Sequence, residues 1–267
     1  DKQELKIFGN NAKTYSAKFF HKEKILNNLV NILNIKEVSK KFTFKIIRDT
    51  ESIPFNKNFV LSGLNLAFLG YWSEKKINIY ENLFHWPDGL FKNIIFSKNI
   101  KKIPGRTLVK QMELNKKIKN IIVVGNCSET SRKYLDVKFK NFRKTYISLP
   151  FDKAEHLAEL VPDMKNDELM FLTLPTPKQE QVAEILVNRS ENYKVICIGA
   201  GIEMASGNEK PVPEYFENYG LEAIYRLKSD TFRRVKRLIE TLFFLIKAIV
   251  NKRLNKIEAK IYEKDKL

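Results

Sequence analysis

Residues 170–187 read MFLTLPTPKQEQVAEILV, and this stretch decides the fold. Met170–Leu174 is a short apolar run of the kind that forms a strand buried on both faces. Pro177–Val187 has the apolar spacing of a helix, and proline is favoured as the first residue of a helix. A buried strand that passes within a few residues into a helix is typical of an α/β protein.

The same alternation continues in both directions along the chain. A short strand is also predicted at Phe42–Ile47, and a helix at His21–Leu33. No internal repeat or low-complexity linker interrupts the pattern, so we predict one α/β domain with a mostly parallel sheet flanked by helices. The other apolar runs that predict strands are Phe59–Leu61, Ile77–Tyr80, Ile121–Val124, Tyr146–Leu149 and Val195–Ile198.

Three segments are expected along the chain. We predict that residues 1–57 form a helix and strand segment packed on the core, and that residues 58–220 form the α/β domain. Residues 221–267 are predicted to form a basic amphipathic helical appendage. The charge pattern separates the third segment from the second.

Several predicted strands end in loops of small or polar residues. In a parallel sheet such loops meet at the carboxyl edge, where α/β proteins bind ligands. Glycine is also common wherever a strand turns into a helix, so each loop alone carries little weight. Together the loops predict one ligand crevice, formed by Ser62-Gly63 with Asn65, Gly125-Asn126, Pro175–Pro177 and Gly199–Gly201.

The chain is strongly basic, with 48 Lys and Arg against 31 Asp and Glu, a formal net charge of +17. This excess favours a polyanionic partner: nucleic acid, an anionic lipid surface or a phosphate-bearing ligand. A generally lysine-rich proteome is the alternative. Cys127 and Cys197 lie beside or within apolar runs, which argues against a disulfide framework and for a reducing, cytoplasmic compartment.

The segment Tyr225–Lys256 predicts a helix with an apolar stripe and dense positive charge. A basic amphipathic helix favours docking on an anionic membrane surface, although its apolar face can instead pack on the core or on a second subunit. A nucleic-acid platform would interleave aromatic and basic residues, whereas Phe243 and Phe244 lie in the apolar stripe. The stretch Leu238–Val250 is too short and too charged to span a bilayer. The polar first residues predict no signal peptide.

Several enzyme classes are excluded by missing motifs. The sequence has no Walker-type phosphate loop, no Gly-x-Ser-x-Gly elbow and no Cys-x-x-Cys pair. His21, His85 and His156 lack metal-ligand spacing, and no Asp-x-Asp is present to hold a divalent ion. We therefore predict no metal and no cofactor, and expect backbone N–H groups, helix N-termini or Arg and Lys to neutralise any diphosphate.

Two elements of the sequence resemble a known family. Leu174–Glu180, which reads LPTPKQE, is similar to the Leu-Gly-x-Pro-Lys-Gln-Glu signature of the WecG/TagA/CpsF glycosyltransferases. Gly220–Leu227, which reads GLEAIYRL, resembles their Gly-Leu-Glu-Trp…Arg-Leu element and is likewise followed by an arginine-rich helix. Across residues 57–240, further matches are Leu61–Leu69, Pro87–Gly89, Ile103–Gly105 and Val124–Asn126.

The resemblance implies a Rossmann-like fold of the GT-E type and an inverting, metal-independent hexosyl transfer. The implied donor is a UDP-sugar, and the implied acceptor is a sugar linked to polyprenyl diphosphate. Such enzymes build teichoic acid, capsule, lipopolysaccharide or enterobacterial common antigen. They work in the cytoplasm, peripherally attached to the inner face of the plasma membrane. The resemblance is compatible with a homo-oligomer, and it implies no nucleic-acid partner.

The resemblance also assigns roles to residues. Asp88 is implied as the general base, although Pro87-Asp88-Gly89 is equally a strong turn signal. The acceptor diphosphate is implied to lie against Arg226, Arg233 and Arg237. The residues implied to bind the donor are Ser62, Asn65, Gly89, Gly105, Gly125, Asn126, Lys178, Gln179, Gly199 and Glu203.

The sequence departs from the family pattern on the donor loops. Gly63 stands where the family has Thr, Thr107 where it has Asp, and Pro175 where it has Gly. Glu203 is a candidate substitute for a family Asp. These departures leave open a related transferase with a different donor or acceptor. A non-catalytic, basic nucleic-acid-binding domain is the less favoured alternative.

Overall fold

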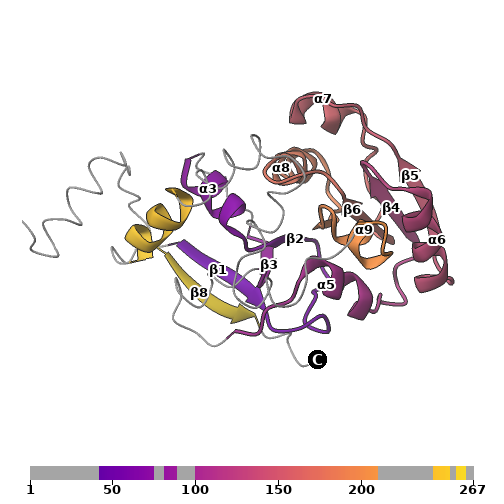
Figure 1. The fold of residues 1–267 in the computed structure, drawn as a ribbon. Helices are drawn as coiled ribbons and strands as arrows, with labels where there is room; N and C mark the ends of the chain where they lie inside the picture. Colours follow the sequence, from indigo (N-terminus) through magenta and orange to yellow (C-terminus); the bar gives the residue numbers. More distant parts are fainter. Residues whose placement is uncertain (1–41, 75–80, 89–99, 210–242, 253–256, 263–267) are drawn as a thin grey trace, which may run out of the picture.

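The computed structural model describes residues 42–74, 81–88, 100–209, 243–252 and 257–262 (Figure 1). Eight strands form a single sheet in the order β5-β4-β6-β7-β2-β3-β1-β8, and every neighbouring pair is parallel. The predicted α/β, Rossmann-like fold is therefore confirmed. The strands are β1 (Phe42–Ile47), β2 (Phe59–Gly63), β3 (Leu83–Trp86), β4 (Asn120–Val124), β5 (Arg143–Ile147), β6 (Glu168–Leu172), β7 (Lys194–Cys197) and β8 (Ile257–Tyr262).

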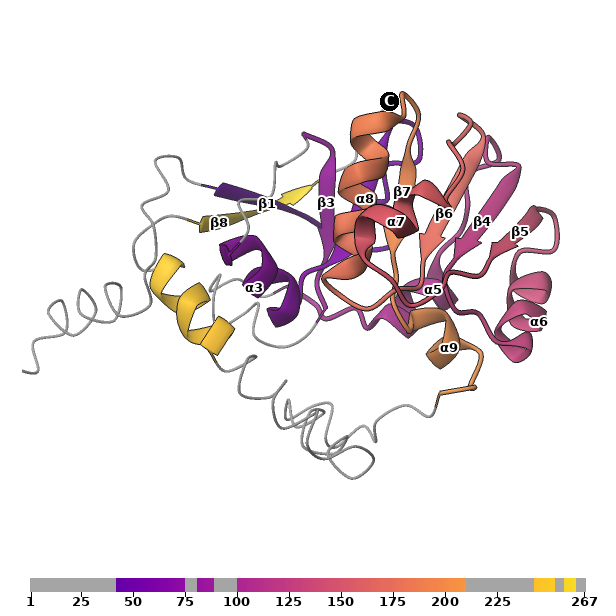
Figure 2. The same ribbon diagram turned by 90° about the horizontal axis from the view of Figure 1, so that it is seen from above.

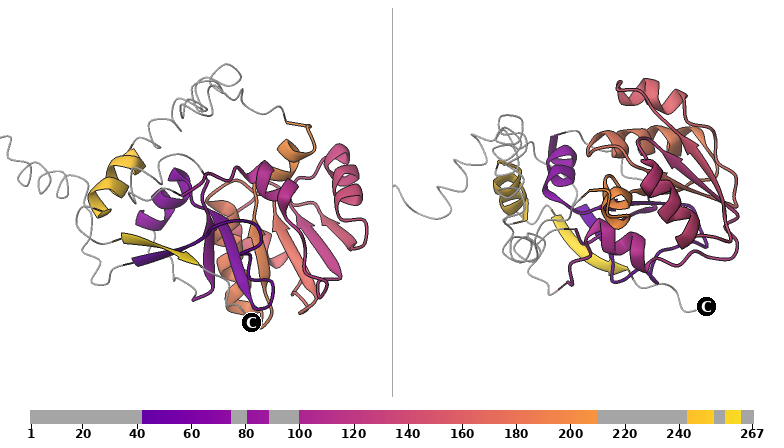
Figure 3. Two further views of the ribbon diagram at one scale, coloured as in Figure 1. Left: turned by 90° about the horizontal axis from the view of Figure 1, so that it is seen from below. Right: turned by 45° about the vertical axis from the view of Figure 1, so that its right-hand side comes forward.

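Helices cover both faces of the sheet (Figures 2 and 3). On one face, the core contains side chains of α3 (Leu66–Glu74), α7 (Ala154–Glu159) and α8 (Lys178–Arg189). The other face packs on α5 (Gly105–Gln111), α6 (Glu129–Lys138) and α9 (Gly201–Ala205). The central strands are buried on both sides, which explains why β4, β6 and β7 are nearly continuous apolar runs.

Several predicted boundaries need correction. Strand β6 is Glu168–Leu172 where Met170–Leu174 was predicted, and β7 is Lys194–Cys197 where Val195–Ile198 was predicted. Pro177 precedes α8 as its N-cap residue, so the helix begins one position later than predicted, at Lys178. Strand β5 is Arg143–Ile147, not the predicted Tyr146–Leu149. Among the described strands it pairs only with β4, and none of its residues is buried. It therefore tolerates polar residues, which give no apolar run. The predicted strand at Ile77–Tyr80 and the predicted helix at His21–Leu33 lie outside the described residues.

Strand β8 was not predicted from the sequence. It pairs in register with all six residues of β1, from Phe42 with Ile257 to Ile47 with Tyr262. Within the predicted C-terminal helix, the structure describes residues 243–252, and these are helical. That segment packs directly on α3, because a Cβ on Gly70 would lie 2.4 Å from the ring of Phe244. None of the helices in the described part of the chain is long and apolar enough to cross a membrane.

Candidate active site

The loops predicted to form one crevice do gather at one edge of the sheet. Since all strands are parallel, the carboxyl ends of β4, β6, β7, β2 and β3 lie side by side in that order. Helix α6 leaves β4 toward one face, and helix α8 leaves β6 toward the other. Such a divergence between neighbouring strands opens the crevice in which doubly wound sheets bind ligands.

A threonine joins the first two of these loops. The Thr173 hydroxyl, just after β6, lies 3.1 Å from the Val124 carbonyl oxygen and 2.9 Å from that of Asn126. Between these carbonyls, Gly125 has φ +110°, and a Cβ there would lie 2.6 Å from Thr173 Oγ1. The Gly125 N–H donates to the Ile147 carbonyl (2.8 Å). Glycine is therefore required at position 125 both for its backbone conformation and for space.

A buried network connects the β6–α8 loop to its other neighbours. Gln179 and Glu180 are each only 4% exposed. Glu180 Oε1 accepts hydrogen bonds from Ser62 Oγ (2.8 Å), Gln179 Nε2 (2.9 Å) and Thr176 Oγ1 (3.2 Å). Gln179 Oε1 accepts from the Gly199 N–H (2.9 Å). Both ends of the Gln179 amide therefore hold the loops together, and its implied contact with the donor stays a prediction.

Lys178, which is implied to bind the donor, contacts the β5–α7 loop in the structure. Its ammonium donates to the Asp152 carbonyl and lies 4.4 Å from the centre of the Phe151 ring. Phe151, in the loop after β5, is 98% exposed. In the protein alone, Lys178 thus ties the start of α8 to the β5–α7 loop.

Glu203 lies on α9, and its carboxylate holds the loop before α6. It accepts hydrogen bonds from the Ser128 N–H and hydroxyl (both 2.8 Å) and from Asn208 Nδ2 (2.6 Å). Partial burial opposes ionisation, but these hydrogen bonds outweigh it and lower the pKa of the Glu203 carboxyl. Asn126, immediately before this loop, is exposed at the crevice.

A lowered carboxyl pKa predicts a pH-dependent contribution of Glu203 to stability. Such a group stabilises the fold above its unfolded pKa, near 4.5, and this stabilisation is lost as pH falls through the lower folded pKa. We expect Glu203→Gln to be less stable than the wild type at pH 7, and the difference to shrink below about pH 4.5. Urea unfolding of both proteins from pH 7 to pH 3 measures this difference in the free energy of unfolding. A difference that stays constant with pH would contradict the assignment.

Asp88 follows β3 at the same edge. Its N–H donates to the Trp86 carbonyl (2.9 Å), and the preceding Pro87 carbonyl accepts from the Ile103 N–H (2.9 Å). That contact brings the segment before α5 beside Asp88. Gly105, the first residue of α5, lies close to α9, because a Cβ on it would be 3.6 Å from Gly201 Cα.

Asn65 has a local role in the structure. Its Oδ1 accepts from the Phe68 N–H (2.9 Å) and so caps α3. The remaining predicted site residues, Gly89, Arg226, Arg233 and Arg237, lie outside the described residues.

No role was predicted for Thr173, Ser128 or Glu180, and Thr176 was predicted only as part of a crevice loop. Thr173 is a polar residue inside the apolar run Met170–Leu174, which marks it as unusual, whereas Ser128 carries no signal of its own. Among the described residues, no three His, Cys, Asp or Glu side chains gather where they could hold a metal ion.

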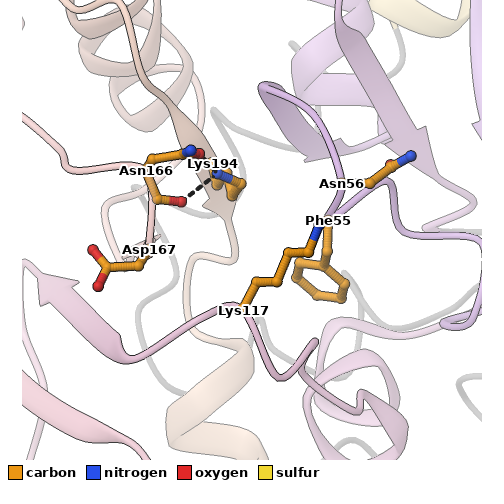
Figure 4. A pocket seen from close by; sticks show the side chains of 6 residues that line it. All are labelled: Phe55, Asn56, Lys117, Asn166, Asp167 and Lys194. Atoms are coloured by element: carbon orange, nitrogen blue, oxygen red, sulfur yellow. Dashed lines mark hydrogen bonds between the residues drawn. The ribbon is translucent and has the colours of Figure 1, made fainter.

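Figure 4 shows the side chains that line a hollow of about 230 Å³. It is at the amino edge, because the residues that line it precede β2, β4 and β6 or begin β7. Lys194 Nζ donates there to the carbonyl (2.6 Å) and to Oδ1 (2.8 Å) of Asn166. The hollow is therefore separate from the candidate active site. Its lining is Phe55, Asn56, Lys117, Asn166, Asp167 and Lys194.

Comparison with known families decides the class of protein. The profile of the glycosyl transferase WecG/TagA/CpsF family matches residues 106–258, more than half of the chain. The chain belongs to the WecG/TagA/CpsF glycosyltransferase family. No curated protein matches it. This glycosyltransferase of cell-surface glycan biosynthesis carries the Pro-Lys-Gln-Glu element at the start of α8, where Gln179 and Glu180 form the centre of the buried network.

Proposed function

We propose that this protein transfers a hexose from a UDP-sugar to a polyprenyl-diphosphate-linked acceptor, with inversion and without a metal ion. The observation that supports this most directly is the convergence of the family's loops at one edge of the sheet, on both sides of the point where α6 and α8 diverge. Helix α8 begins there with Lys178, a cation of the kind that binds a diphosphate. The sequence offers no Asp-x-Asp, so backbone N–H groups and cations neutralise the diphosphate.

In the proposed reaction, Asp88 is the general base. Its carboxylate takes the proton of the acceptor hydroxyl while the hydroxyl oxygen attacks the anomeric carbon. The bond from that carbon to the UDP oxygen breaks, and UDP leaves with the electron pair. One displacement inverts the anomeric configuration. Arg226, Arg233 and Arg237 are proposed to hold the diphosphate of the acceptor lipid.

A screen of UDP-sugars by thermal shift tests the donor, since a ligand that binds only the folded protein raises the melting temperature. We expect one UDP-sugar, or a narrow set, to stabilise the protein in the presence of EDTA. NMR of the product made with a synthetic polyprenyl-diphosphate acceptor then shows the anomeric configuration. If no UDP-sugar binds but another nucleotide sugar does, the departures at Gly63 and Pro175 mark a different donor.

The proposed site of action is the inner face of the plasma membrane. Truncation after Ser229 is a poor test, because it would remove β8 from the sheet. We expect replacement of Arg226, Arg233 and Arg237 by Gln to weaken binding to vesicles containing anionic lipid, by about 1 kcal/mol per charge near the surface. Vesicle pelleting measures this binding, with neutral vesicles as the control. Equal pelleting of variant and wild type on anionic vesicles would refute the proposal.

A further inference from the structure

We infer that Glu180 is a positioning residue for glycosyl transfer, whose carboxylate holds three loops of the active-site edge in one arrangement. The three side chains that donate to it converge on a single oxygen, Oε1. They come from the end of β2, the β6–α8 loop and the first turn of α8. The inference rests on the proposed placing of the donor at this edge.

Three neighbouring strands supply a polar layer directly beneath the loops. Ser62 of β2 pairs in register with His85 of β3 on one side and with Cys197 of β7 on the other. All three are buried, and they point to the same face of the sheet, because in-register residues of parallel strands do so. Burial lowers the pKa of His85 to about 3, so its ring is neutral at physiological pH. The Cys197 thiol lies 3.8 Å from the Gln179 carbonyl oxygen.

A buried polar layer of this kind stabilises the fold less than an apolar layer would. Burial raises the pKa of the Glu180 carboxyl, which shows the cost of holding the charge there. A buried charge with good hydrogen bonds is often no more stabilising than apolar residues of similar volume. Stability alone therefore does not account for a carboxylate at position 180, whereas the connection between loops does.

Glu180 reaches the third loop through Gln179. The Gln179 side chain donates to Glu180 through Nε2, and with Oε1 it accepts from the Gly199 N–H. This second bond fixes Gly199, where the backbone turns with φ +55° between β7 and α9. Loss of the carboxylate therefore frees Ser62 and weakens the hold on Thr176 and Gly199. Thr176 keeps its bond from Gln179 Nε2, and the Gly199 N–H keeps its bond to the Leu172 carbonyl.

The two carboxylate oxygens are used unequally, and this gives a sharp pair of variants. Glu180 Oε2 is buried and has no hydrogen-bond partner among the described residues. In Glu180→Gln, the amide oxygen can accept all three bonds while the NH2 group takes the place of Oε2. In Glu180→Leu, similar volume is kept, but Ser62 and Thr176 lose their acceptor, and Gln179 Nε2 keeps only its bond to Thr176 Oγ1 (3.0 Å). Glu180→Gln thus removes the charge but keeps the hydrogen-bond acceptor, and Glu180→Leu removes the acceptor but keeps the volume.

Hydrogen exchange of the protein without ligand tests the inference directly. In Glu180→Leu we expect amides in residues 62–66, 173–178 and 198–203 to exchange about tenfold faster or more, and those in 143–147 to be unchanged. Glu180→Gln should exchange like the wild type. Glu184→Leu is the matched control, since Glu184 lies one turn further along α8 and meets Tyr71 of α3 instead of the loops. If Glu180→Leu does not fold, Ser62→Ala should speed exchange in residues 62–66 alone.

Measurements of donor binding and of kcat then test whether the arrangement of the loops affects the reaction. We expect Glu180→Leu to lower kcat about tenfold or more relative to Glu184→Leu, and Glu180→Gln to restore it. Unchanged exchange in Glu180→Leu, or equal losses in the Leu and Gln variants, would overturn the inference. If the wild type binds no UDP-sugar, the proposed function fails, while the exchange experiment still decides whether Glu180 holds the loops.

Discussion

Asp88→Asn is expected to lower the rate of sugar transfer by about 10²–10⁴-fold while the fold and donor binding stay intact. The substitution keeps the size and shape of the side chain and removes the group that accepts the proton. The hydrogen bond from residue 88 to the Trp86 carbonyl is made by the backbone, so it survives. The loss should appear in kcat, because a missing base raises only the barrier of the chemical step.

This variant also separates the two interpretations of Pro87-Asp88-Gly89. If Asp88 only shapes a turn, Asn serves as well, because both residues favour turns through the same side-chain hydrogen bonds. Near-wild-type transfer by Asp88→Asn would therefore assign the residue to the turn and remove the proposed base.

Asp49→Asn is the matched control for that experiment. Asp49 follows β1, the neighbour of β3, and its Oδ1 accepts from the Ser52 N–H (2.9 Å) and hydroxyl (2.7 Å). Asparagine can make the same bonds, so we expect unchanged transfer. Single-turnover assays with the donor found by the thermal-shift screen, together with nucleotide binding measured on both variants, check the prediction.

The central fold could be predicted from the sequence because its strands are buried on both faces. Burial on both sides requires nearly unbroken apolar runs, and Ile121–Val124 and Met170–Leu172 show this plainly. Strand β8 reads IEAKIY, with charged residues at Glu258 and Lys260. It is a strand because it pairs with β1, and that contact joins residues more than two hundred positions apart. No local pattern indicates such a pairing.

The site could be predicted as a set of loops but not as a set of contacts. Strand ends followed by Gly or Asn place the loops at one edge, since the topology of a parallel sheet requires it. The direction of a side chain depends on distant partners. Glu180 is buried, and one of its donors is Ser62, 118 residues earlier in the chain. The Lys178 side chain contacts Asp152 and Phe151. A lysine has many rotamers, and the sequence alone does not show which one is adopted.

Gly125→Ala is expected to destabilise the protein by about 2–4 kcal/mol, the largest effect of any single added methyl group at this edge. Two costs add. A non-glycine residue at φ +110° is strained, and its Cβ would lie 2.6 Å from Thr173 Oγ1. That oxygen is held by the Val124 and Asn126 carbonyls, so it cannot withdraw without losing hydrogen bonds. The urea midpoint and slope measure the change in the free energy of unfolding.

Gly207→Ala and Thr173→Ala separate the two costs. Gly207 also has positive φ, +81°, but a Cβ there meets no atom of the described residues within 4 Å, so its substitution should show backbone strain alone, about 1–3 kcal/mol. Removing the Thr173 hydroxyl relieves the clash at position 125. The double variant Gly125→Ala with Thr173→Ala should therefore be more stable than the sum of the single changes predicts. Additive effects would mean that Thr173 does not confine Gly125, and that backbone conformation alone requires glycine between β4 and the crevice.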